Sequence, residues 1–311
     1  MASIGILSRD AKEYQALIEQ SDLINADLVV VSNTPDCKTD WSQIDILLAD
    51  PNLATQIVEK CTHLKWLQST WAGNTPLLKL QKKNYQLCGV KDVFGASMRE
   101  YVFAYLLHFS RNIEAFQQAQ HNALWQPPEY AYLKGKTLGI MGLGSIGKTL
   151  AKAAKIFEMQ VHGLSYSSHD CQDVDRYFSN NELIEFAGKL DYLVCLLPDT
   201  DKTYNLVEQT FLNALPNHCV LINAGRGQVI NQQALLQALH TRQLRAAVLD
   251  VFEQEPLPAD HPFWHTQNVY ITQHTAAKSE PQDIVEIFMD NFKRYHNKQT
   301  LKYLLEFERG Y

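Results

Sequence analysis

Short apolar runs alternate with stretches of helical periodicity over the first hundred residues. Each run is short enough to be a buried strand, and the stretches between the runs place apolar residues at helical spacing. We expect strands at residues 4–7, 28–31, 44–49 and 64–68, and helices at 12–20 and 54–61. Strands that alternate with helices in this way predict a parallel sheet covered by helices.

A second alternating series follows a long helical stretch at residues 97–120. The apolar stripe of that stretch consists of Tyr101, Tyr105, Leu106, Phe109 and Ile113. The strands expected in the second series lie at residues 138–141, 160–164, 192–197, 219–223, 246–250 and 269–272. Short strands in this number, with helices between them, fit a doubly wound sheet. A final helix is expected at residues 282–295.

The second series opens on Lys136-Thr-Leu-Gly-Ile-Met-Gly-Leu-Gly-Ser-Ile-Gly-Lys148, where an apolar strand runs directly into glycines spaced G-x-G-x-x-G. Gly142 permits a tight turn, Gly144 lets a pyrophosphate approach the backbone, and Gly147 lets the following helix pack closely. The helix then offers free N–H groups and the positive end of its dipole to the phosphates. A plain strand–turn–helix junction is the alternative. In this context we predict a dinucleotide site.

The two series predict an α/β protein with two doubly wound domains. We expect a Rossmann cofactor domain at residues 99–283, inserted into a flavodoxin-like substrate domain made of residues 1–98 and 284–311. A length of 311 residues is sufficient for two domains that each bury a core.

Composition narrows the class of partner. A net charge of −6, with acidic and basic residues interspersed, argues against nucleic acid or an anionic membrane surface. No apolar run approaches transmembrane length, and none of the cysteines forms a C-x-x-C pair. His261 and His265 have i,i+4 spacing, but Pro262 between them argues against a helical metal pair. We expect a cytoplasmic protein with a small-molecule ligand and no metal.

Three polar side chains follow expected strands of the second series: Arg226, Glu255 and His274. The carboxyl ends of parallel strands meet at one edge of a sheet, where ligands bind. Arg226 lies between two glycines in Asn-Ala-Gly-Arg-Gly and can present two parallel N–H bonds to a carboxylate. The alternative for Arg226 is a surface arginine in a turn, and the alternative for His274 is a structural histidine.

Acidic residues crowd the segment that contains Glu255. Asp250, Glu253 and Asp260 lie nearby, and spacing alone does not choose among the four. Whichever acid is used, a carboxylate next to His274 would stabilise its imidazolium form and raise its pKa.

An arginine, an acid and a histidine beside a dinucleotide site predict hydride transfer. When hydride moves to or from the cofactor, a proton must move to or from oxygen, and histidine is the natural donor near neutral pH. Arg226 would orient a substrate carboxylate. The expected substrate is a small 2-oxo acid or 2-hydroxy acid.

At this point the sequence resembles the D-isomer-specific 2-hydroxyacid dehydrogenase family. The order and spacing of the matching motifs hold from about residue 135 to 280, and the first hundred residues match more loosely, at Leu67–Gly73 and Met98–Val102. The motifs are Gly142-Leu-Gly-Ser-Ile-Gly147, Leu197-Pro-Asp-Thr200 with Thr203, Asn223-Ala-Gly-Arg-Gly-Gln-Val-Ile230, Leu249-Asp-Val-Phe-Glu-Gln-Glu-Pro256, His261-Pro-Phe-Trp264 and Thr272-Gln-His-Thr-Ala276.

The resemblance implies an NAD(P)-dependent enzyme that interconverts a small 2-oxo acid and the D-2-hydroxy acid, of the glyoxylate/hydroxypyruvate reductase type. The family's substrate-binding arginine falls on Arg226, its acidic partner on Glu255 and its proton-transferring histidine on His274. Backbone N–H groups of Ala72 and Gly73 would bind the substrate carboxylate. Family members are mostly homodimers paired through the cofactor domain.

The cofactor contacts that the resemblance implies extend over most of the second series. Asp250 would meet the nicotinamide carboxamide, and Leu197, Pro198 and Thr203 would line the adenosine side. The full expected set is Gly142, Gly144, Ser145, Ile146, Gly147, Ser165, Ser167, Leu197, Pro198, Thr203, Asn223, Ala224, Gly225, Asp250, His274 and Ala276.

The chain departs from the family pattern at three places. Gln273 stands where many relatives have proline before the histidine, and Trp71, beside the carboxylate loop, either narrows the pocket or packs in the core. No acid ends the second strand near Ser165, where NAD-specific relatives bind the ribose hydroxyls. Hydroxyls of Ser165, Ser167 and Ser168, with His169, could accept a 2′-phosphate, so we expect NADP in preference to NAD.

Two other functions remain open from the sequence. One is a dinucleotide-sensing binding protein, like the transcriptional corepressors that resemble this family. The other is a formate- or phosphite-type dehydrogenase on the same scaffold.

Overall fold

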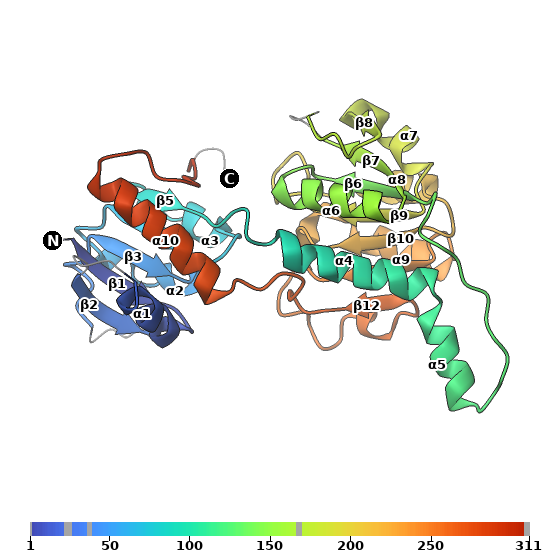
Figure 1. The fold of residues 1–311 in the computed structure, drawn as a ribbon, viewed down its shortest axis with the longest axis horizontal. Coiled ribbons are helices and arrows are strands. Elements are labelled where there is room, and N and C mark those ends of the chain that lie inside the picture. The colour runs from blue at the N-terminus through green and yellow to red at the C-terminus, as the bar shows by residue number, and fades with distance from the viewer. Residues whose placement is uncertain (1, 22–26, 36–38, 166–169, 308–311) are drawn as a thin grey trace. The chain divides into compact units, whose positions relative to one another are not determined.

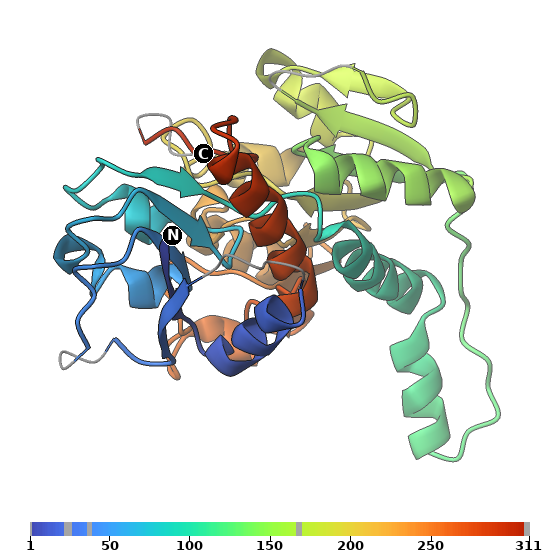
Figure 2. The ribbon, with the colours of Figure 1, turned by 60° about the vertical axis from the view of Figure 1, so that its left-hand side comes forward.

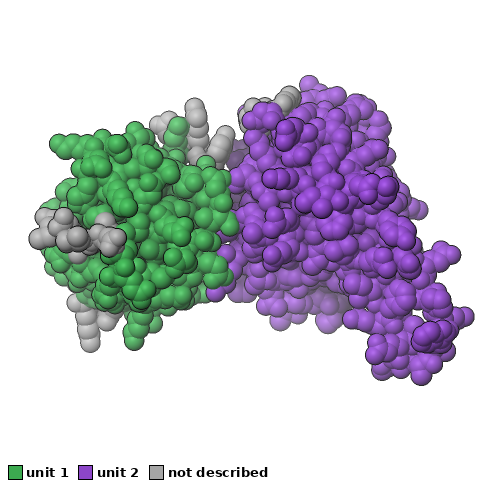
Figure 3. Space-filling view, viewed as in Figure 1, with its two compact units in different colours: residues 1–93, 279–311 green, residues 94–278 purple. Residues whose placement is uncertain are grey.

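The computed structural model describes residues 2–21, 27–35, 39–165 and 170–307. The chain divides into a first unit, residues 1–93 with 279–311, and a second unit, residues 94–278 (Figures 1 and 3). The boundaries predicted at 98 and 283 therefore each lie a few residues too late. Each cuts a helix, because α4 (Gly95–Ser110) packs on the second unit and α10 (Pro281–His296) packs on the first.

The first unit is built on a five-stranded parallel sheet with the order β2-β1-β3-β4-β5, which is flavodoxin-like. The strands are β1 (Ser3–Leu7), β2 (Asp27–Ser32), β3 (Ile46–Ala49), β4 (Trp66–Ser69) and β5 (Gln86–Cys88). The helices are α1 (Ala11–Glu19), α2 (Pro51–Ala54), the 3₁₀ turn η1 (Val58–Lys60), α3 (Thr75–Leu78) and α10. The predicted helix at 54–61 is wrong, because α2 and η1 replace it with two separate turns. The three-residue β5 was not predicted.

The last helix completes the first unit. Figures 1 and 2 show α10 beside α1, although the two are far apart in the sequence. Trp66 on β4 stacks on Phe288 of α10 with 5.2 Å between ring centroids. The buried side chain of Asn291 also donates to Gln68 on β4, at 3.0 Å. These contacts tie the end of the chain to a sheet formed by its first ninety residues.

The second unit is built on a seven-stranded parallel sheet with the order β12-β11-β10-β9-β6-β7-β8. The strands are β6 (Thr137–Met141), β7 (Gln160–Leu164), β8 (Arg176–Phe178), β9 (Tyr192–Cys195), β10 (Val220–Asn223), β11 (Ala246–Leu249) and β12 (Val269–Ile271). The order reverses between β6 and β9, as in a Rossmann sheet, and this reversal is where such sheets bind dinucleotides. The short edge strand β8 was not predicted.

Helices cover both faces of this sheet. Alternate residues of the central strands enter different cores: Leu193 and Cys195 of β9 enter one, and Tyr192 and Val194 enter the other. Burial on both faces explains why these strands are continuously apolar. The covering elements are α4, α6 (Ser145–Ile156), α7 (Leu183–Ala187), α8 (Gln209–Ala214), α9 (Gln232–His240) and the 3₁₀ turns η2 (Asn180–Glu182), η3 (Gly227–Val229) and η4 (Pro262–His265). Helix α5 (Ile113–His121) follows α4 and buries no residue.

The long helix predicted at 97–120 is two helices. Asn112 lies between α4 and α5 with a φ of 53°, a left-handed conformation that asparagine tolerates and that ends α-helical hydrogen bonding. Its side chain donates to the carbonyl of Glu129 at 2.9 Å, which holds the bend. None of the helices in the described ranges is long and apolar enough to cross a membrane.

Candidate active site

The glycine loop joins β6 to α6 at the reversal of strand order. Gly142 has a φ of 102°, and a Cβ there would lie 3.2 Å from the backbone of Leu196. A Cβ on Gly147 would lie 2.2 Å from the carbonyl oxygen of Gly142. Gly144 caps α6, and a Cβ there would meet no described atom within 4 Å. The loop is therefore tight on its inner side and open at Gly144, at the N-terminal end of α6, which fits a pyrophosphate.

Arg226 follows β10 in a turn that its neighbours brace. The buried side chain of Asn223 accepts from the N–H of Gly225 at 3.2 Å and donates to the carbonyl of Arg226 at 3.0 Å. The guanidinium donates to the carbonyl of Gly225 at 2.7 Å. Burial lowers the pKa of Arg226, but arginine remains charged in proteins. The remaining N–H groups of this guanidinium donate to no described residue.

A close backbone contact locks the Arg226 turn to the segment after β11. A Cβ on Gly227 would lie 1.9 Å from the carbonyl carbon of Phe252, so no side chain fits there. The N–H of the same Phe252 donates to Glu255 at 2.9 Å. Gly227 was not singled out from the sequence, although it stands in the Asn-Ala-Gly-Arg-Gly motif that drew attention to Arg226.

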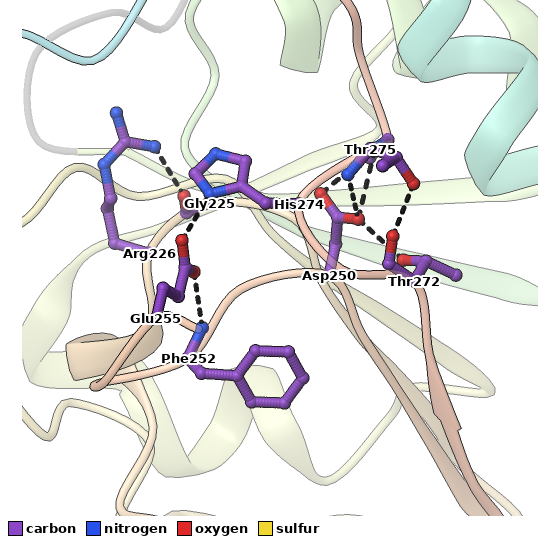
Figure 4. Close-up of polar contacts among 9 residues, drawn as sticks. Gly225, Arg226, Asp250, Phe252, Glu255, Thr272, His274 and Thr275 are labelled. Carbon is purple, nitrogen blue, oxygen red and sulfur yellow. Dashed lines mark hydrogen bonds and ion pairs between the residues drawn. The ribbon is translucent and has the colours of Figure 1, made fainter. Parts of the chain in front are cut away.

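Glu255 and His274 form a hydrogen-bonded pair. The Nδ1 atom of His274 lies 2.7 Å from Oε2 of Glu255, while Oε1 accepts from Phe252 (Figure 4). The side chains of Glu255 and His274 keep 36% and 55% of their surfaces exposed, so a ligand can reach the pair. Nδ1 is committed to Glu255, and Nε2 makes no hydrogen bond to a described residue.

The charges in this cluster act on one another. The hydrogen bond to Glu255 raises the pKa of His274, against the opposing effects of burial and of Arg226; Glu255 and Asp250 also favour the cation through their charges. Partial burial alone would raise the pKa of Glu255, but the hydrogen bonds from His274 and Phe252 outweigh it and lower that pKa. The structure thus brings Arg226, Glu255 and His274 together (Figure 4).

Asp250, at the end of β11, holds the loop that carries His274. Its buried carboxylate accepts from the Thr272 hydroxyl at 2.6 Å and from the backbone N–H groups of Thr275 and Ala276 at 2.7 and 3.1 Å. The N–H of His274 donates to the carbonyl of Asp250 at 2.6 Å. This bracing role was not predicted, and the expected contact of Asp250 with the nicotinamide stays a prediction.

Two successive residues of this loop have left-handed backbone conformations. Gln273 has a φ of 57° and His274 a φ of 60°. Proline, with φ fixed near −65°, cannot adopt the conformation of Gln273. With Gln273 at this position, the loop follows a backbone path that proline could not adopt, and the hydrogen bonds to Asp250 hold it in that path.

The remaining expected cofactor residues surround the same sheet edge. Thr203 donates to the carbonyl of Pro198 at 2.6 Å, so its hydroxyl braces the loop after β9. A Cβ on Gly225 would lie 2.8 Å from the carbonyl oxygen of Leu197, which brings that loop against the Arg226 turn. Ser165 directly follows β7, whereas Ser167, Ser168 and His169 lie outside the described residues. Ser145 and Ile146 begin α6, Ala224 follows β10, and Ala276 is buried.

The expected carboxylate loop lies in the first unit, directly after β4. Ser69 Oγ accepts from the N–H of Trp71 at 3.0 Å, and the Asn74 side chain donates to the carbonyls of Trp71 and Ala72 at 3.3 and 3.2 Å. Among the described residues, the N–H groups of Ala72 and Gly73 have no acceptor. Trp71 is half-buried. Within the described ranges no three His, Cys, Asp or Glu side chains gather as a metal site requires.

Known proteins resemble the chain in sequence and in fold. The model of the D-isomer specific 2-hydroxyacid dehydrogenase NAD binding domain matches residues 103–276. Glyoxylate/hydroxypyruvate reductase A of Salmonella paratyphi B is 31% identical over 218 residues, which are 70% of this chain and 70% of that protein.

Two crystal structures show the same architecture over nearly the full length. A D-isomer specific 2-hydroxyacid dehydrogenase family protein from Aeromonas salmonicida superposes with a TM-score of 0.94 at 37% identity, covering 98% of this chain and 99% of that one. The NADPH-dependent glyoxylate/hydroxypyruvate reductase of Sinorhizobium meliloti, in complex with NADP and sulfate, superposes with a TM-score of 0.88 at 25% identity over 100% of both chains.

The two doubly wound units, the glycine loop and these matches define an NAD(P)-binding oxidoreductase. The chain belongs to the D-isomer specific 2-hydroxyacid dehydrogenase family. The fold class, the family and the nicotinamide dinucleotide predicted from the sequence are thereby confirmed.

Proposed function

We propose that this protein reduces glyoxylate, hydroxypyruvate or a closely related small 2-oxo acid to the D-2-hydroxy acid, with His274 as proton donor, Glu255 as its partner and Arg226 as the carboxylate ligand. The observation that carries the proposal is the 2.7 Å hydrogen bond between His274 and Glu255 beside a guanidinium held at the end of β10. The Salmonella relative is named for these two substrates.

The geometry supports a separate task for each of the three side chains. In the imidazolium form, the Nδ1–H of His274 donates to Glu255 and the Nε2–H is free to donate to the carbonyl oxygen of the oxo acid. After the proton leaves Nε2, the neutral ring keeps its Nδ1–H bond to Glu255, so its orientation does not change. Arg226 binds the carboxylate and polarises the neighbouring carbonyl. The nicotinamide, when bound, supplies the hydride.

The second unit would hold the dinucleotide at the open side of Gly144. The first N–H groups of α6 would bind the pyrophosphate, and the loops after β9 and β10 would flank it. We propose a preference for NADPH. Ser165 stands after β7, in place of the acid that binds ribose hydroxyls in NAD-specific enzymes, and an acid there would repel a 2′-phosphate. The Sinorhizobium relative is described as NADPH-dependent.

The first unit would contribute the backbone of Ala72 and Gly73 to the substrate carboxylate. Two N–H groups without an intramolecular acceptor among the described residues, on a turn pinned by Ser69 and Asn74, are the chemistry that binds an anion. Trp71 would then limit the size of the oxo acid's substituent.

A substrate panel tests the function. Purified protein is assayed with glyoxylate, hydroxypyruvate, pyruvate and a bulkier 2-oxo acid, each with NADPH and with NADH, and with formate and phosphite in the oxidising direction. We expect turnover of the small oxo acids and a higher kcat/KM with NADPH. Dinucleotide binding without turnover of any oxo acid would favour a sensing protein, and formate or phosphite oxidation would favour the other dehydrogenase. A higher kcat/KM with NADH would contradict only the cofactor preference.

We also propose that the protein forms a homodimer through its second unit, with α5 and the chain that follows it at the interface. Every residue of α5 is exposed or half-buried. Figures 1 and 2 show this segment extending from the rest of the second unit. The exposed apolar side chains along it are Ile113, Phe116, Leu124, Trp125, Tyr130 and Tyr132. An apolar surface of this kind is typical of a surface that another chain covers.

The oligomeric state tests the dimer. We expect the wild type to sediment as a dimer and a Leu124→Ser/Trp125→Ser variant as a monomer, because Trp125 is fully exposed within one chain. Exposed Ile184 on α7, replaced by serine, is the matched control and should leave the dimer intact. A wild-type monomer at micromolar concentration would contradict the proposal.

A further inference from the structure

Helix α4 makes a hydrogen bond to each end of the loop that carries His274. Tyr101 Oη lies 2.9 Å from Thr272 Oγ1, and Ser97 Oγ donates to the carbonyl of Ala276 at 3.2 Å. Ser97 and Tyr101 are four residues apart, so they lie on one face of the helix. Both contacts join residues of the second unit. Neither α4 residue belongs to the proposed reactive set.

The direction of the first contact follows from proton accounting. The carboxylate of Asp250 can only accept, so the single hydroxyl proton of Thr272 points to Asp250, 2.6 Å away. Tyr101 must therefore donate to Thr272. The result is a continuous chain of donors from Tyr101 through Thr272 to Asp250, which also accepts the N–H groups of Thr275 and Ala276. Burial raises the pKa of Tyr101, which keeps its proton in place across the working pH range.

The loop needs such anchors because its backbone is unfavourable. Gln273 and His274 both have left-handed conformations, and such residues persist only where the surroundings fix them. Thr272 precedes them and Ala276 follows them. Side chains of α4 thus hold the residues on either side of the strained pair. Asp250 holds the loop between them, because it accepts hydrogen bonds from the N–H groups of His274 and Thr275.

We propose that Tyr101 and Ser97 are positioning residues that set the place of His274 against Glu255 by fastening Thr272 and Ala276 to α4. This inference rests on the proposed function of His274. It gives α4 a role in proton transfer without any contact with substrate. Helix α4 begins just after Phe94, the first residue of the second unit, and Ala276 lies just before Lys278, its last residue. The bond from Ser97 to Ala276 therefore joins the beginning and the end of the second unit's chain.

The test replaces Tyr101 by phenylalanine, which removes the hydroxyl and keeps the ring. We expect kcat for glyoxylate reduction with NADPH to fall roughly tenfold, the effect of one lost hydrogen bond. The KM for glyoxylate and the Kd of NADPH should change by less than about twofold, because Arg226 and the glycine loop are untouched. Ser97→Ala should lower kcat in the same direction and by less.

The pH profile separates positioning from a merely structural role. A displaced His274 keeps less of its bond to Glu255, so the pH at which kcat for reduction declines should move down, toward the ordinary histidine value. A variant that is only less stable would show a lower Tm and an unchanged profile for the enzyme that remains folded. An unchanged profile together with a wild-type kcat would overturn the proposal.

Two matched controls complete the experiment. Tyr105→Phe removes a hydroxyl one turn further along α4 and should leave kcat and the profile unchanged. Thr272→Ser keeps the relay hydroxyl and should retain activity, whereas Thr272→Val, of the same shape, should behave like Tyr101→Phe. Equal activity of the two Thr272 variants would contradict the relay. If His274→Ala is inactive while Tyr101→Phe is normal, only the positioning role fails; if His274→Ala is active, the proposed function itself fails.

Discussion

Replacing His274 by alanine is expected to lower kcat for 2-oxo acid reduction by about 10²- to 10⁴-fold, the usual contribution of a general acid. Nε2 of His274 makes no hydrogen bond to a described residue and can therefore face a ligand, and alanine leaves no donor in its place. The Kd of NADPH, measured by fluorescence titration, should stay near the wild-type value because the glycine loop lies on other elements. Near-normal turnover in this variant would remove the basis of the proposed mechanism.

The pH dependence of the wild-type enzyme independently tests the assignment of His274 as the proton donor. The hydrogen bond to Glu255 raises the pKa of His274, so reduction, which needs the imidazolium, should stay fast to a pH above the ordinary histidine value and decline as pH rises through the raised pKa. Oxidation of the hydroxy acid needs the neutral ring and should rise over the same interval. Glu255→Gln removes the negative partner and should move both limbs to lower pH. Limbs that do not move would assign the titration to another group.

Replacing Gly227 by alanine adds a single methyl group and is expected to disrupt the site. The added Cβ would lie 1.9 Å from the carbonyl carbon of Phe252; that carbon belongs to the backbone and the Cβ is fixed to the Gly227 backbone, so the two loops must separate. Overpacking of this severity costs about 3 kcal/mol, which corresponds to a fall in Tm of roughly 6–12 °C. Separation also moves the N–H that holds Glu255, so kcat should fall at least tenfold even at temperatures where the variant is folded.

Gly144→Ala is the matched control for that experiment. The new methyl group meets no described atom within 4 Å, and the φ of −71° suits alanine. Its stability cost should stay within about 1 kcal/mol, the difference between glycine and alanine at a helix N-cap. The methyl group instead occupies the side from which we expect a pyrophosphate to approach, so the Kd of NADPH should rise. A stable Gly227→Ala variant with normal kcat would show that the loops adjust freely.

The sequence was sufficient to predict the architecture because strands that are buried on both faces consist of short runs of apolar residues. All the central strands of both sheets were found in this way, together with the edge strands β2 and β12. The edge strands β5 (Gln86–Cys88) and β8 (Arg176–Phe178) were missed because each opens on a polar residue and leaves only two apolar positions. The bend at Asn112 was missed for a related reason. One left-handed residue interrupts a helix without interrupting its pattern of apolar residues.

The sequence predicted which side chains meet at the candidate site, but not the contacts that hold them there. Arg226, Glu255 and His274 stand where strands end, which a sequence reveals, and the resemblance chose Glu255 among four acids. The bond from Thr272 to Asp250, the donation from Tyr101 and the contact of Gly227 with Phe252 join segments far apart in the chain. Such contacts depend on loop geometry, which no local pattern encodes.

All the side chains proposed to act on the reacting carbonyl, together with the glycine loop, come from one uninterrupted stretch, residues 94–278. The family match at 103–276 falls entirely inside it. Because one uninterrupted stretch encodes them, the proposed acid–base residues and the glycine loop form a genetic unit separate from the turn that contains Trp71.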